Sequence, residues 1–280
     1  MRLTILSDNQ ALDDRHLIAE PGWSIYIQEG GKNILFDLGY SDAFMQNAGK
    51  LDINLLDLDY IVLSHGHADH TWGLIPLIRL YTEADSAAVI HKRPDLVAHP
   101  DAFYLKITNR IPQAGPRLSI EELSHYLTLR LSREPLWLTD NVVFLGEIER
   151  KYPVYSEERK KREILAEEGV QPDLLLDDTA LACKTRGGLV IVTGCSHSGI
   201  MNIIEYARQV CNEKRILDVI GGLHLLNPRE EQLNATLRYF EEVQPEHLHA
   251  SHCTDLPSKI ALSSVAPLEE SGVGLQIEYT

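Results

Sequence analysis

Four short predicted strands in this chain each end in a loop that carries histidine, and this feature restricts the fold more than any other. Two of these runs, 60–63 and 189–193, consist mainly of apolar residues and are bounded by turn residues, which is typical of buried strands. Stretches with helical periodicity separate them, and in folds with this order of elements ligands bind where the strands end. The sequence therefore predicts a layered α/β protein whose histidines meet at one edge of its sheets. The runs and their loops are 60–63 before the cluster at 65–70, 189–193 before His197, 218–220 before His224, and 246–250 before His252.

The same patterns predict the other elements of the chain. The Gly30-Gly31 pair marks a hairpin between two of the strands. The middle of the chain, 94–172, is less regular and holds seven of the 13 prolines. We interpret it as an insertion that shapes substrate access in a single domain spanning 1–280, with a plain structural extension as an equal alternative. Further strands are predicted at 3–6, 23–28, 33–37, 87–91 and 180–184, and helices at 43–51, 73–81, 120–131, 156–168, 200–211 and 230–242.

The composition argues against several classes of protein. The formal charge of −15 repels phosphate backbones, and the sequence shows no basic groove, so we expect no nucleic-acid partner. The run 159–162 is basic, but acids follow it, which is typical of a solvated helix face. No segment approaches the ~20 apolar residues of a membrane span, and the first strand lacks the pattern of a secretory signal. Four cysteines without a CxxC pair fit reduced thiols. We expect a cytoplasmic protein with no membrane partner.

The run 65–70 predicts a metal site. Three imidazoles and one carboxylate, from His65, His67, His70 and Asp69, fall within six residues directly after an apolar strand. Imidazole and carboxylate groups hold zinc, iron or manganese while leaving positions open for water and substrate. Without a metal, three close imidazoles would repel one another when protonated and would need several hydrogen-bond partners when buried. We therefore predict these four residues as metal ligands.

The isolated histidines are judged by their positions. His197 and His252 each follow a core strand at the same predicted edge, so we predict both as metal ligands. His224 follows a Gly-Gly turn that permits close approach of the backbone to a ligand, and its role stays open between metal ligand and substrate contact. His247 and His249 share one strand face and are interpreted as packed side chains or as partners of a ligand. The histidines without supporting neighbours, interpreted as structural, are His16, His91, His99 and His125.

The sequence leaves two interpretations open for Cys195 and for the acidic pair Asp177-Asp178. Cys195 is interpreted as a small buried residue at a strand end, with metal ligation as the alternative. The acidic pair Asp177-Asp178 precedes a strand, and turn chemistry accounts for it. The alternative for Asp178 is a role at the metal or behind its ligands.

The string at 63–71, Leu-Ser-His-Gly-His-Ala-Asp-His-Thr, resembles the HxHxDH signature of the metallo-beta-lactamase superfamily. The resemblance implies a four-layer αββα sandwich of two similar halves, with metals at one edge of the two facing sheets. The string Phe36-Asp37-Leu38-Gly39 resembles the end of an early strand of that superfamily, and the later histidines follow in the expected order. The resemblance covers nearly the whole chain.

A narrower similarity concerns the strings 177–180, 193–200, 221–225 and 252–254. They are similar to the branch named after an archaeal dihydropterin-methyl-ribofuranosylaminobenzene-phosphate synthase, a condensing enzyme of methanopterin synthesis. Many members of this branch have no assigned substrate. One position departs from the superfamily: where many of its hydrolases carry a Gly-Asp whose carboxylate bridges two metals, this chain has Gly194-Cys195. The departure puts the bridging carboxylate and a second metal in question.

The resemblance also implies how the ligands divide. His65, His67 and His197 would hold one divalent ion, and the other would be held by Asp69, His70 and His252. Asp69 is in addition the candidate catalytic residue, as a proton acceptor from water. Zinc is the expected metal, with iron or manganese as alternatives.

Three hypotheses for function follow. The leading one is a metal-dependent hydrolase that acts on a small ester, lactone or phosphorylated compound through a metal-activated water. The second is a pterin-related condensing synthase, in which the same metals bind a diphosphate leaving group or orient a pterin, and Trp72 and Tyr152 stack on its ring. The third is a metal-binding sensor without catalysis. The expected partner is a small-molecule substrate, and the sequence leaves the oligomeric state open.

Overall fold

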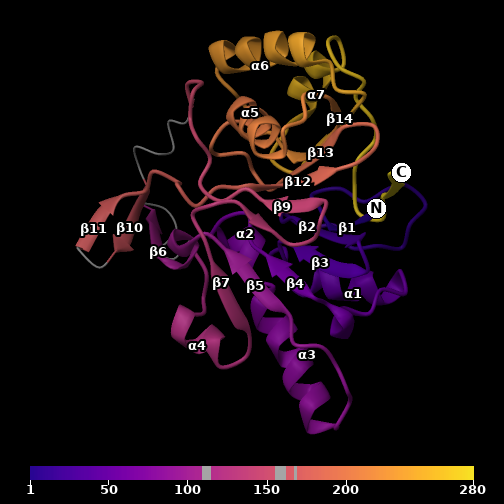
Figure 1. Cartoon of the computed structure of the whole chain (residues 1–280), viewed down its shortest axis with the longest axis vertical. Helices are drawn as coiled ribbons and strands as arrows, with labels where there is room; N and C mark the ends of the chain where they lie inside the picture. Colours follow the sequence, from indigo (N-terminus) through magenta and orange to yellow (C-terminus); the bar gives the residue numbers. More distant parts are fainter. Residues whose placement is uncertain (109–114, 155–161, 167–168) are drawn as a thin grey trace.

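The computed structural model describes residues 1–108, 115–154, 162–166 and 169–280. Two main sheets, one seven-stranded and one six-stranded, lie face to face between layers of helices (Figure 1). Helices α5 (Ile200–Cys211), α6 (Glu230–Val243) and α7 (Leu256–Leu262) cover one side of the pair of sheets, and α1 (Ala43–Lys50) and α3 (Leu74–Ser86) cover the other. This arrangement is the four-layer αββα sandwich that the sequence predicts.

The seven-stranded sheet comes from the first half of the chain and from the C-terminus. Its strands β1, β2 and β3 are antiparallel, and β3, β4, β5 and β7 are parallel. The predicted hairpin between β2 and β3 is confirmed, with Gly30 and Gly31 at φ +59° and +72°, a conformation that glycine adopts without strain. In spatial order the strands are β16 (Gln276–Glu278), β1 (Arg2–Ser7), β2 (Ser24–Glu29), β3 (Lys32–Phe36), β4 (Tyr60–Val62), β5 (Asp95–Ala98) and β7 (Thr128–Leu131).

The six-stranded sheet comes mainly from the second half. Its strands β13, β14 and β15 run parallel, and each is followed by a loop with a histidine. Because parallel strands point the same way, these loops lie at one edge of the sheet, as the sequence predicts. In spatial order the strands are β15 (His247–Ser251), β14 (Ile216–Gly222), β13 (Leu189–Thr193), β12 (Ala180–Lys184), β9 (Val142–Phe144) and β8 (Leu136–Trp137).

Apolar side chains fill three layers of core. One cluster fills the space between the two sheets and includes Phe36, Phe144 and Val192, all fully buried. The other two lie between each sheet and its helices. Helix α5 shows why these segments form helices: the buried residues Ile200, Ile204, Ala207 and Cys211 recur at a spacing of three or four, which places them on one stripe facing the sheet. The helix ends at Asn212, which adopts the left-handed conformation that closes many helices.

The middle segment 94–172, for which the sequence suggests an insertion, contributes strands to all three sheets. Much of it belongs to the sandwich, because it contributes β5 and β7 to one main sheet and β8 and β9 to the other. Only a third, three-stranded sheet lies apart, at one side of the molecule (Figure 1). Whether this region controls substrate access stays a prediction. The third sheet has the order β11 (Gly169–Pro172), β10 (Arg162–Ala166), β6 (Leu105–Thr108).

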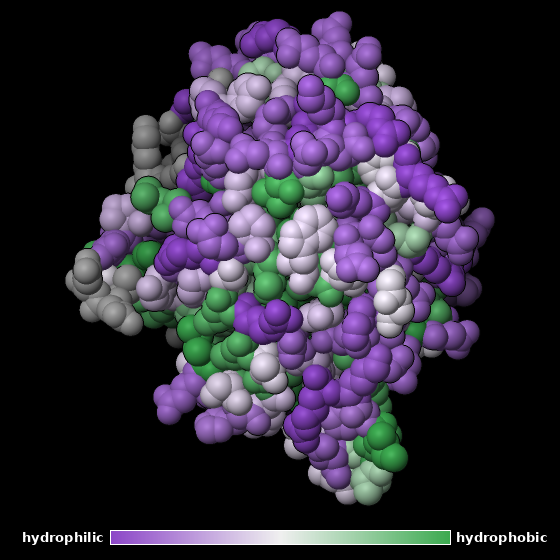
Figure 2. All heavy atoms as spheres, in the orientation of Figure 1, coloured by the Kyte–Doolittle hydropathy of each residue, from purple (hydrophilic) through white to green (hydrophobic). Residues whose placement is uncertain are grey.

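Three predicted elements differ from the structure. The strand predicted at 87–91 is wrong: this segment is a loop after α3 in which Val89 and Ile90 are 47% and 99% exposed, and the strand β5 follows it. Hydrophobic side chains are visible at the lower tip of the molecule, next to α3 (Figure 2). The helix predicted at 120–131 stops early, since α4 (Ile120–Ser124) is followed by β7.

The helix predicted at 156–168 is also wrong where the structure describes it. Residues 162–166 form strand β10, which pairs with β6 on one side and β11 on the other. Cross-strand pairing therefore overrides the local helical pattern. The rest of that segment, 155–161 and 167–168, lies outside the described residues.

The short helices complete the inventory of described elements. They are α2 (Ala68–Thr71) and the 3-10 helices η1 (Leu55–Asp57) and η2 (Pro100–Phe103). Within the described ranges, no helix combines the length and the apolar character that crossing a membrane requires.

The core between the sheets should dominate stability. We expect Phe144→Ala to lower the free energy of unfolding by about 3–5 kcal/mol, because it removes a fully buried ring and leaves a cavity. The matched control Ile90→Ala alters a side chain that is 99% exposed and should change that free energy by less than about 0.5 kcal/mol. Urea unfolding followed by circular dichroism measures both. Equal effects of the two substitutions would contradict the assigned core.

Candidate metal centre

The first group of predicted ligands comes from two loops that are far apart in sequence. His65 and His67 follow β4, and His197 follows β13. Nε2 of His65 lies 2.9 Å from Nδ1 of His67, and Nε2 of His197 lies 3.2 Å from the same Nδ1. All three rings are buried, and their nitrogen atoms form a group that could hold one metal ion. We refer to these residues as the first triad.

The second group lies next to the first. Oδ2 of Asp69 is 3.7 Å from Nε2 of His70 and 3.5 Å from Nε2 of His252. These three residues, the second triad, also form a group that could hold a metal ion. The rings of His65 and His70 have centroids 4.2 Å apart, which places the two triads side by side. The structure thus brings six predicted ligands together from loops that span residues 65–252.

His224 lies at the border of this cluster. Its ring centroid is 4.5 Å from that of His197, on the side of the first triad. Among the described residues, however, it joins none of the compact groups of ligand atoms. The role of His224 therefore stays open between metal ligand and substrate contact.

The electrostatics of the cluster suit metal binding. Burial holds the pKa of His65, His67 and His197 well below the usual 6.5, so these imidazoles are neutral, which is the form that binds metals. Burial also lowers the pKa of His252 to about 3. Within the described residues, the buried Nε2 of His252 has no hydrogen-bond partner. A buried acceptor without a donor is costly, and a cation between His252, His70 and Asp69 would satisfy it.

Asp37 holds ligands of both triads in place. Its Oδ1 accepts a hydrogen bond from the backbone N–H of Ser64 (2.7 Å), and its Oδ2 accepts one from the Ser64 hydroxyl (2.6 Å). Oδ2 is also 2.7 Å from Nδ1 of His70, and the Ser64 hydroxyl lies 2.8 Å from Nδ1 of His65. Burial tends to lower the pKa of His70, but Asp69 and Asp37 outweigh it and raise that pKa to about 9. Sequence reasoning assigned Asp37 no role, although its position at a strand end was a signal.

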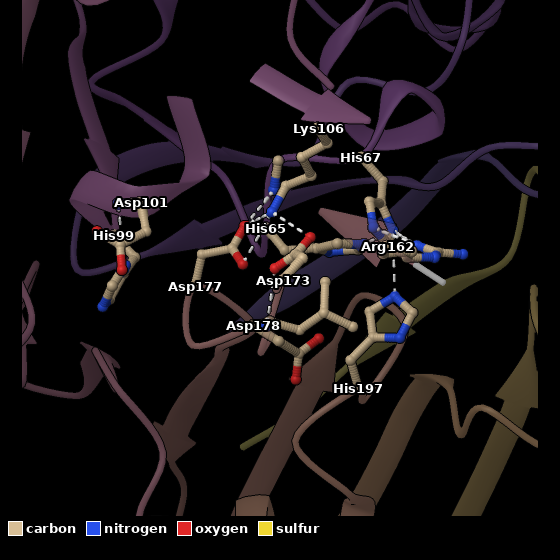
Figure 3. Close-up of polar contacts among 12 residues, drawn as sticks. His65, His67, His99, Asp101, Lys106, Arg162, Asp173, Asp177, Asp178 and His197 are labelled. Carbon is tan, nitrogen blue, oxygen red and sulfur yellow. Dashed lines mark hydrogen bonds and ion pairs between the residues drawn. The ribbon is translucent and has the colours of Figure 1, made fainter. Parts of the chain in front are cut away.

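The turn at Gly66 is fixed from behind by a buried ion pair. A Cβ atom at Gly66 would clash with the carbonyl oxygen of Ala102, so only glycine fits here. The Gly66 N–H donates to Oδ2 of Asp177 (2.8 Å), and Nζ of Lys106 lies 3.1 Å from Oδ1 of the same carboxylate. Lys106 also reaches Asp173 at 3.3 Å (Figure 3). Asp177 therefore anchors the loop of the first triad, a role that turn chemistry alone did not predict.

Asp178 supports the other loop of the first triad. Its Oδ2 accepts a hydrogen bond from the backbone N–H of Ser198 at 2.7 Å, next to His197. Its side chain is fully buried, and burial raises its pKa to about 6. The structure therefore favours the alternative in which Asp178 acts behind a ligand.

Arg162 brings a positive charge to the first triad. The side chain extends from β10, and its Nη1 contacts Nε2 of His67 and lies 3.3 Å from Nδ1 of the same ring (Figure 3). The interpretation of the run 159–162 as a solvated helix face is thus wrong for Arg162, and 159–161 lie outside the described residues. No local pattern distinguishes Arg162 from its basic neighbours, so sequence reasoning missed it.

A cavity of about 280 Å³ lies beside the centre, between the third sheet and the segment 173–177. Lys106 and Asp177, which anchor the turn at Gly66, form part of its wall. Tyr104, Ile164 and Gln171 from the third sheet and its surroundings complete this side. Among the described residues that line it there is none of the six predicted ligands, and the role of the middle segment in substrate access stays a prediction.

Comparison with known proteins agrees with this geometry. The model of the metallo-beta-lactamase superfamily matches residues 17–201. Over 254 residues the chain is 30% identical to the 7,8-dihydropterin-6-methyl-4-(beta-D-ribofuranosyl)-aminobenzene-5'-phosphate synthase of Methanocaldococcus jannaschii, a match that covers 84% of this chain and 82% of the relative. An uncharacterized protein of the same archaeon is 33% identical over 270 residues, or 94% of each chain.

Solved structures show the same fold. A crystal structure described as a metal-dependent hydrolase of the beta-lactamase superfamily superposes with a TM-score of 0.83 and 28% identity, covering 99% of this chain and 98% of the other. A diphosphatase of the PhnP family shares the fold with a TM-score of 0.53 and 15% identity, over 100% and 98% of the two chains. The family match, the fold and the convergent histidines lead to one conclusion: the chain belongs to the metallo-beta-lactamase superfamily.

Proposed function

We propose that this protein is a metal-dependent hydrolase whose substrate is a small phosphorylated compound. One observation carries the proposal: two adjacent triads of metal ligands share a sheet edge, and the guanidinium of Arg162 faces the first of them. The triads supply the ligand types and the number of ligands that catalytic metals need. The arginine selects, among esters, lactones and phosphorylated compounds, the substrates that carry negative charge.

The first triad would hold one divalent ion and the second triad the other, with zinc as the expected metal. When bound, such ions act as Lewis acids that acidify water and polarise a phosphoryl or carbonyl oxygen. Asp37 and Asp177 fix the ligand loops in advance, so little reorganisation accompanies binding.

Asp69 is suited to accept a proton from the attacking water. Its side chain is 35% exposed, whereas that of His70 beside it is fully buried, so Asp69 faces the side from which water and substrate arrive. A carboxylate has two oxygens, and one can contact a metal while the other takes the proton.

Arg162 is the cation that would recognise the substrate. The chain carries a formal charge of −15, so an anion depends on local positive charge to approach, which the metal ions would supply together with Arg162. Lys106 does not supply it, because Asp173 and Asp177 both lie within 3.3 Å of its Nζ. Arg162 instead contacts His67 in the first triad, where a phosphoryl oxygen could bind both a metal and the guanidinium.

A condensing synthase is the second candidate, favoured by the 30% identity to a relative with that name. This reaction would also bring a phosphorylated substrate to Arg162, but an amine rather than water would attack. The predicted ring stacking gains no support: Trp72 already stacks on Tyr40 with centroids 4.8 Å apart, and Tyr152 packs edge-on against Tyr239. A coupled assay with a dihydropterin diphosphate and an aminobenzene ribosyl phosphate distinguishes the two candidates, because only the synthase forms the condensed pterin.

Hydrolysis should depend on the metal ligands. Chelation, or His67→Ala, should lower kcat/KM for nitrophenyl phosphate mono- and diesters by at least about 100-fold, since several kcal/mol of transition-state stabilisation are lost. Zinc should restore the chelated protein but not His67→Ala. The exposed His125→Ala serves as the control and should retain full activity. If the metal-replete protein hydrolyses none of these esters, the proposal is wrong.

The carboxylate of Asp37 should set the metal affinity. Asp37→Asn keeps the size of the side chain but removes the charge that orients His70, and we expect zinc binding to weaken about 10–100-fold. Asp59→Asn, which removes a carboxylate paired with surface lysines, should leave the affinity unchanged. Competition with a chromogenic chelator measures both dissociation constants. Equal affinities of Asp37→Asn and the unchanged protein would show that Asp37 does not position the ligands.

Arg162 should distinguish anionic from neutral substrates. Arg162→Gln should lower kcat/KM for phosphate esters by about 10–100-fold, the loss of one charged hydrogen bond of about 1.5–3 kcal/mol, and should leave neutral acetate esters nearly unaffected. Arg162→Lys keeps the charge and should recover part of the loss. The exposed Arg238→Gln is the control. A similar loss for both classes of ester would mean that Arg162 only supports the structure.

A further inference from the structure

We propose that Asn9 is a positioning residue of the metal centre, because it fixes which nitrogen of His252 carries the proton and so presents the other nitrogen to the metal of the second triad. The inference rests on the metal centre proposed above and adds a residue from a loop that holds none of the six predicted ligands. Oδ1 of Asn9 lies 3.0 Å from Nδ1 of His252, although 243 positions separate the two residues.

This contact connects the two main sheets at the edge where the ligands lie. Asn9 belongs to the loop that follows β1 of the seven-stranded sheet, and His252 directly follows β15 of the six-stranded sheet. The second triad therefore depends on the relative position of the two sheets, and the loop after β1 forms part of the second metal position.

The chemistry of the amide decides the tautomer of the ring. A neutral imidazole has one nitrogen that carries hydrogen and one that has a free lone pair. An amide oxygen only accepts hydrogen bonds, so Nδ1 of His252 donates to Asn9 and the lone pair stays on Nε2. Nε2 is the atom that lies 3.5 Å from Oδ2 of Asp69, on the side of the second triad. In the other tautomer Nε2 would carry the hydrogen and could bind no metal until that proton moved.

The backbones of both partners are held by one carboxylate. Buried Asp8 accepts a hydrogen bond from the N–H of Asn9 at 2.7 Å and another from the N–H of His252 at 3.0 Å. His252 has a φ of +50°, a left-handed conformation that costs conformational energy in a residue other than glycine. The bond to Asp8 supports this conformation and sets His252 opposite Asn9.

The rest of the loop is also anchored. Val273 donates its N–H to the carbonyl of Gln10 at 2.8 Å, and Leu12 donates to the carbonyl of Val273 at 3.1 Å. At the far end of the loop, the N–H of Ile18 donates to Oδ1 of the buried Asn47 at 2.8 Å. The side chain of Asn9 is exposed, so these backbone contacts, rather than burial, fix its position beside the ring.

Two other ligands show the same pattern with a different acceptor. The hydroxyl of Ser64 donates to Asp37, so it accepts from Nδ1 of His65, and Asp37 itself accepts from Nδ1 of His70. An acceptor with a full negative charge raises the basicity of the imidazole, and a neutral amide raises it less. Asn9 therefore orients His252 without adding charge to the second metal position, whereas Asp37 adds charge at His70.

The tautomer can be measured in the metal-free full chain. Long-range proton–nitrogen correlation spectra distinguish a protonated Nδ1 from a protonated Nε2, and the signals lost in His252→Gln identify the ring. We expect a protonated Nδ1 in the unchanged protein and a shift toward protonated Nε2 in Asn9→Leu, which keeps the size of the side chain but has no acceptor. The adjacent exposed amide provides the control Gln10→Leu, which should leave the tautomer unchanged. A protonated Nε2 in the unchanged protein, or no shift in Asn9→Leu, would overturn the inference.

Zinc affinity provides the second measurement, by competition with a chromogenic chelator. Asn9→Leu should raise one of two zinc dissociation constants by about 10–100-fold and leave the other unchanged, since only the second triad contains His252. Asn9→Asp keeps an acceptor oxygen and should bind zinc at least as tightly as the unchanged protein, and Gln10→Leu should bind it equally well. Circular dichroism verifies that each variant is folded, and Asn9→Ala provides a second substitution should Asn9→Leu fail that check.

The outcomes separate this inference from the proposed metal centre. Equal weakening of both zinc constants in Asn9→Leu, or binding by Asn9→Asp as weak as by Asn9→Leu, would overturn the role of the amide oxygen and leave the ligands standing. If the unchanged protein binds no second zinc, the second triad itself is wrong. The tautomer of the metal-free protein still decides the role of Asn9 in that case, because its measurement needs no metal.

Discussion

The buried carboxylate of Asp37 holds together the sheet edge at which the predicted metal ligands lie. It directly follows β3 and accepts two hydrogen bonds from Ser64, which lies two residues after β4, so it ties two neighbouring parallel strands at the edge where the ligands gather. The same carboxylate contacts His70 and, through the Ser64 hydroxyl, sets the ring of His65. One ligand of each triad therefore depends on a single buried charge. The packed core of the sandwich extends to this edge, and these contacts hold the loops that carry the predicted ligands.

This arrangement concentrates costs that only a cation can offset. Five imidazoles from the two triads are packed with little access to water, and burial keeps most of them neutral. Neutral rings in contact have nitrogen atoms that need partners, and a buried acceptor without one lowers stability. Divalent ions bound to the triads would be coordinated by these nitrogen atoms and would provide the missing partners. The stability of the folded chain and its metal content are thus expected to be linked, as in other sites where ligands are assembled by the fold.

Much of the fold and of the ligand set could be predicted because both depend on local patterns in the sequence, namely strand-like runs followed by turns that carry histidine. His197 follows an apolar run and a turn, and His252 follows a predicted strand and a turn. The parallel pairing of these strands then brings both histidines to one edge. Asp177 and Lys106 could not be found in this way, because 71 positions separate them and no periodicity connects an ion pair across that distance. Strand β10 was missed for a similar reason: its two charged and three apolar residues show no alternation, and they become a strand only through pairing with β6 and β11.

The residues that escaped prediction are those that should decide the substrate. The two main sheets carry the ligands, and their loops are fixed by short-range geometry. The third sheet carries Arg162 to the first triad and lines the adjacent cavity, and its strands come from the least regular part of the sequence. A division of this kind lets one metal centre serve different substrates, since changes in the third sheet need not disturb the strands that hold the histidines. The name of a relative is therefore a weaker guide to the reaction of this chain than the side chain that β10 places beside the candidate metal centre.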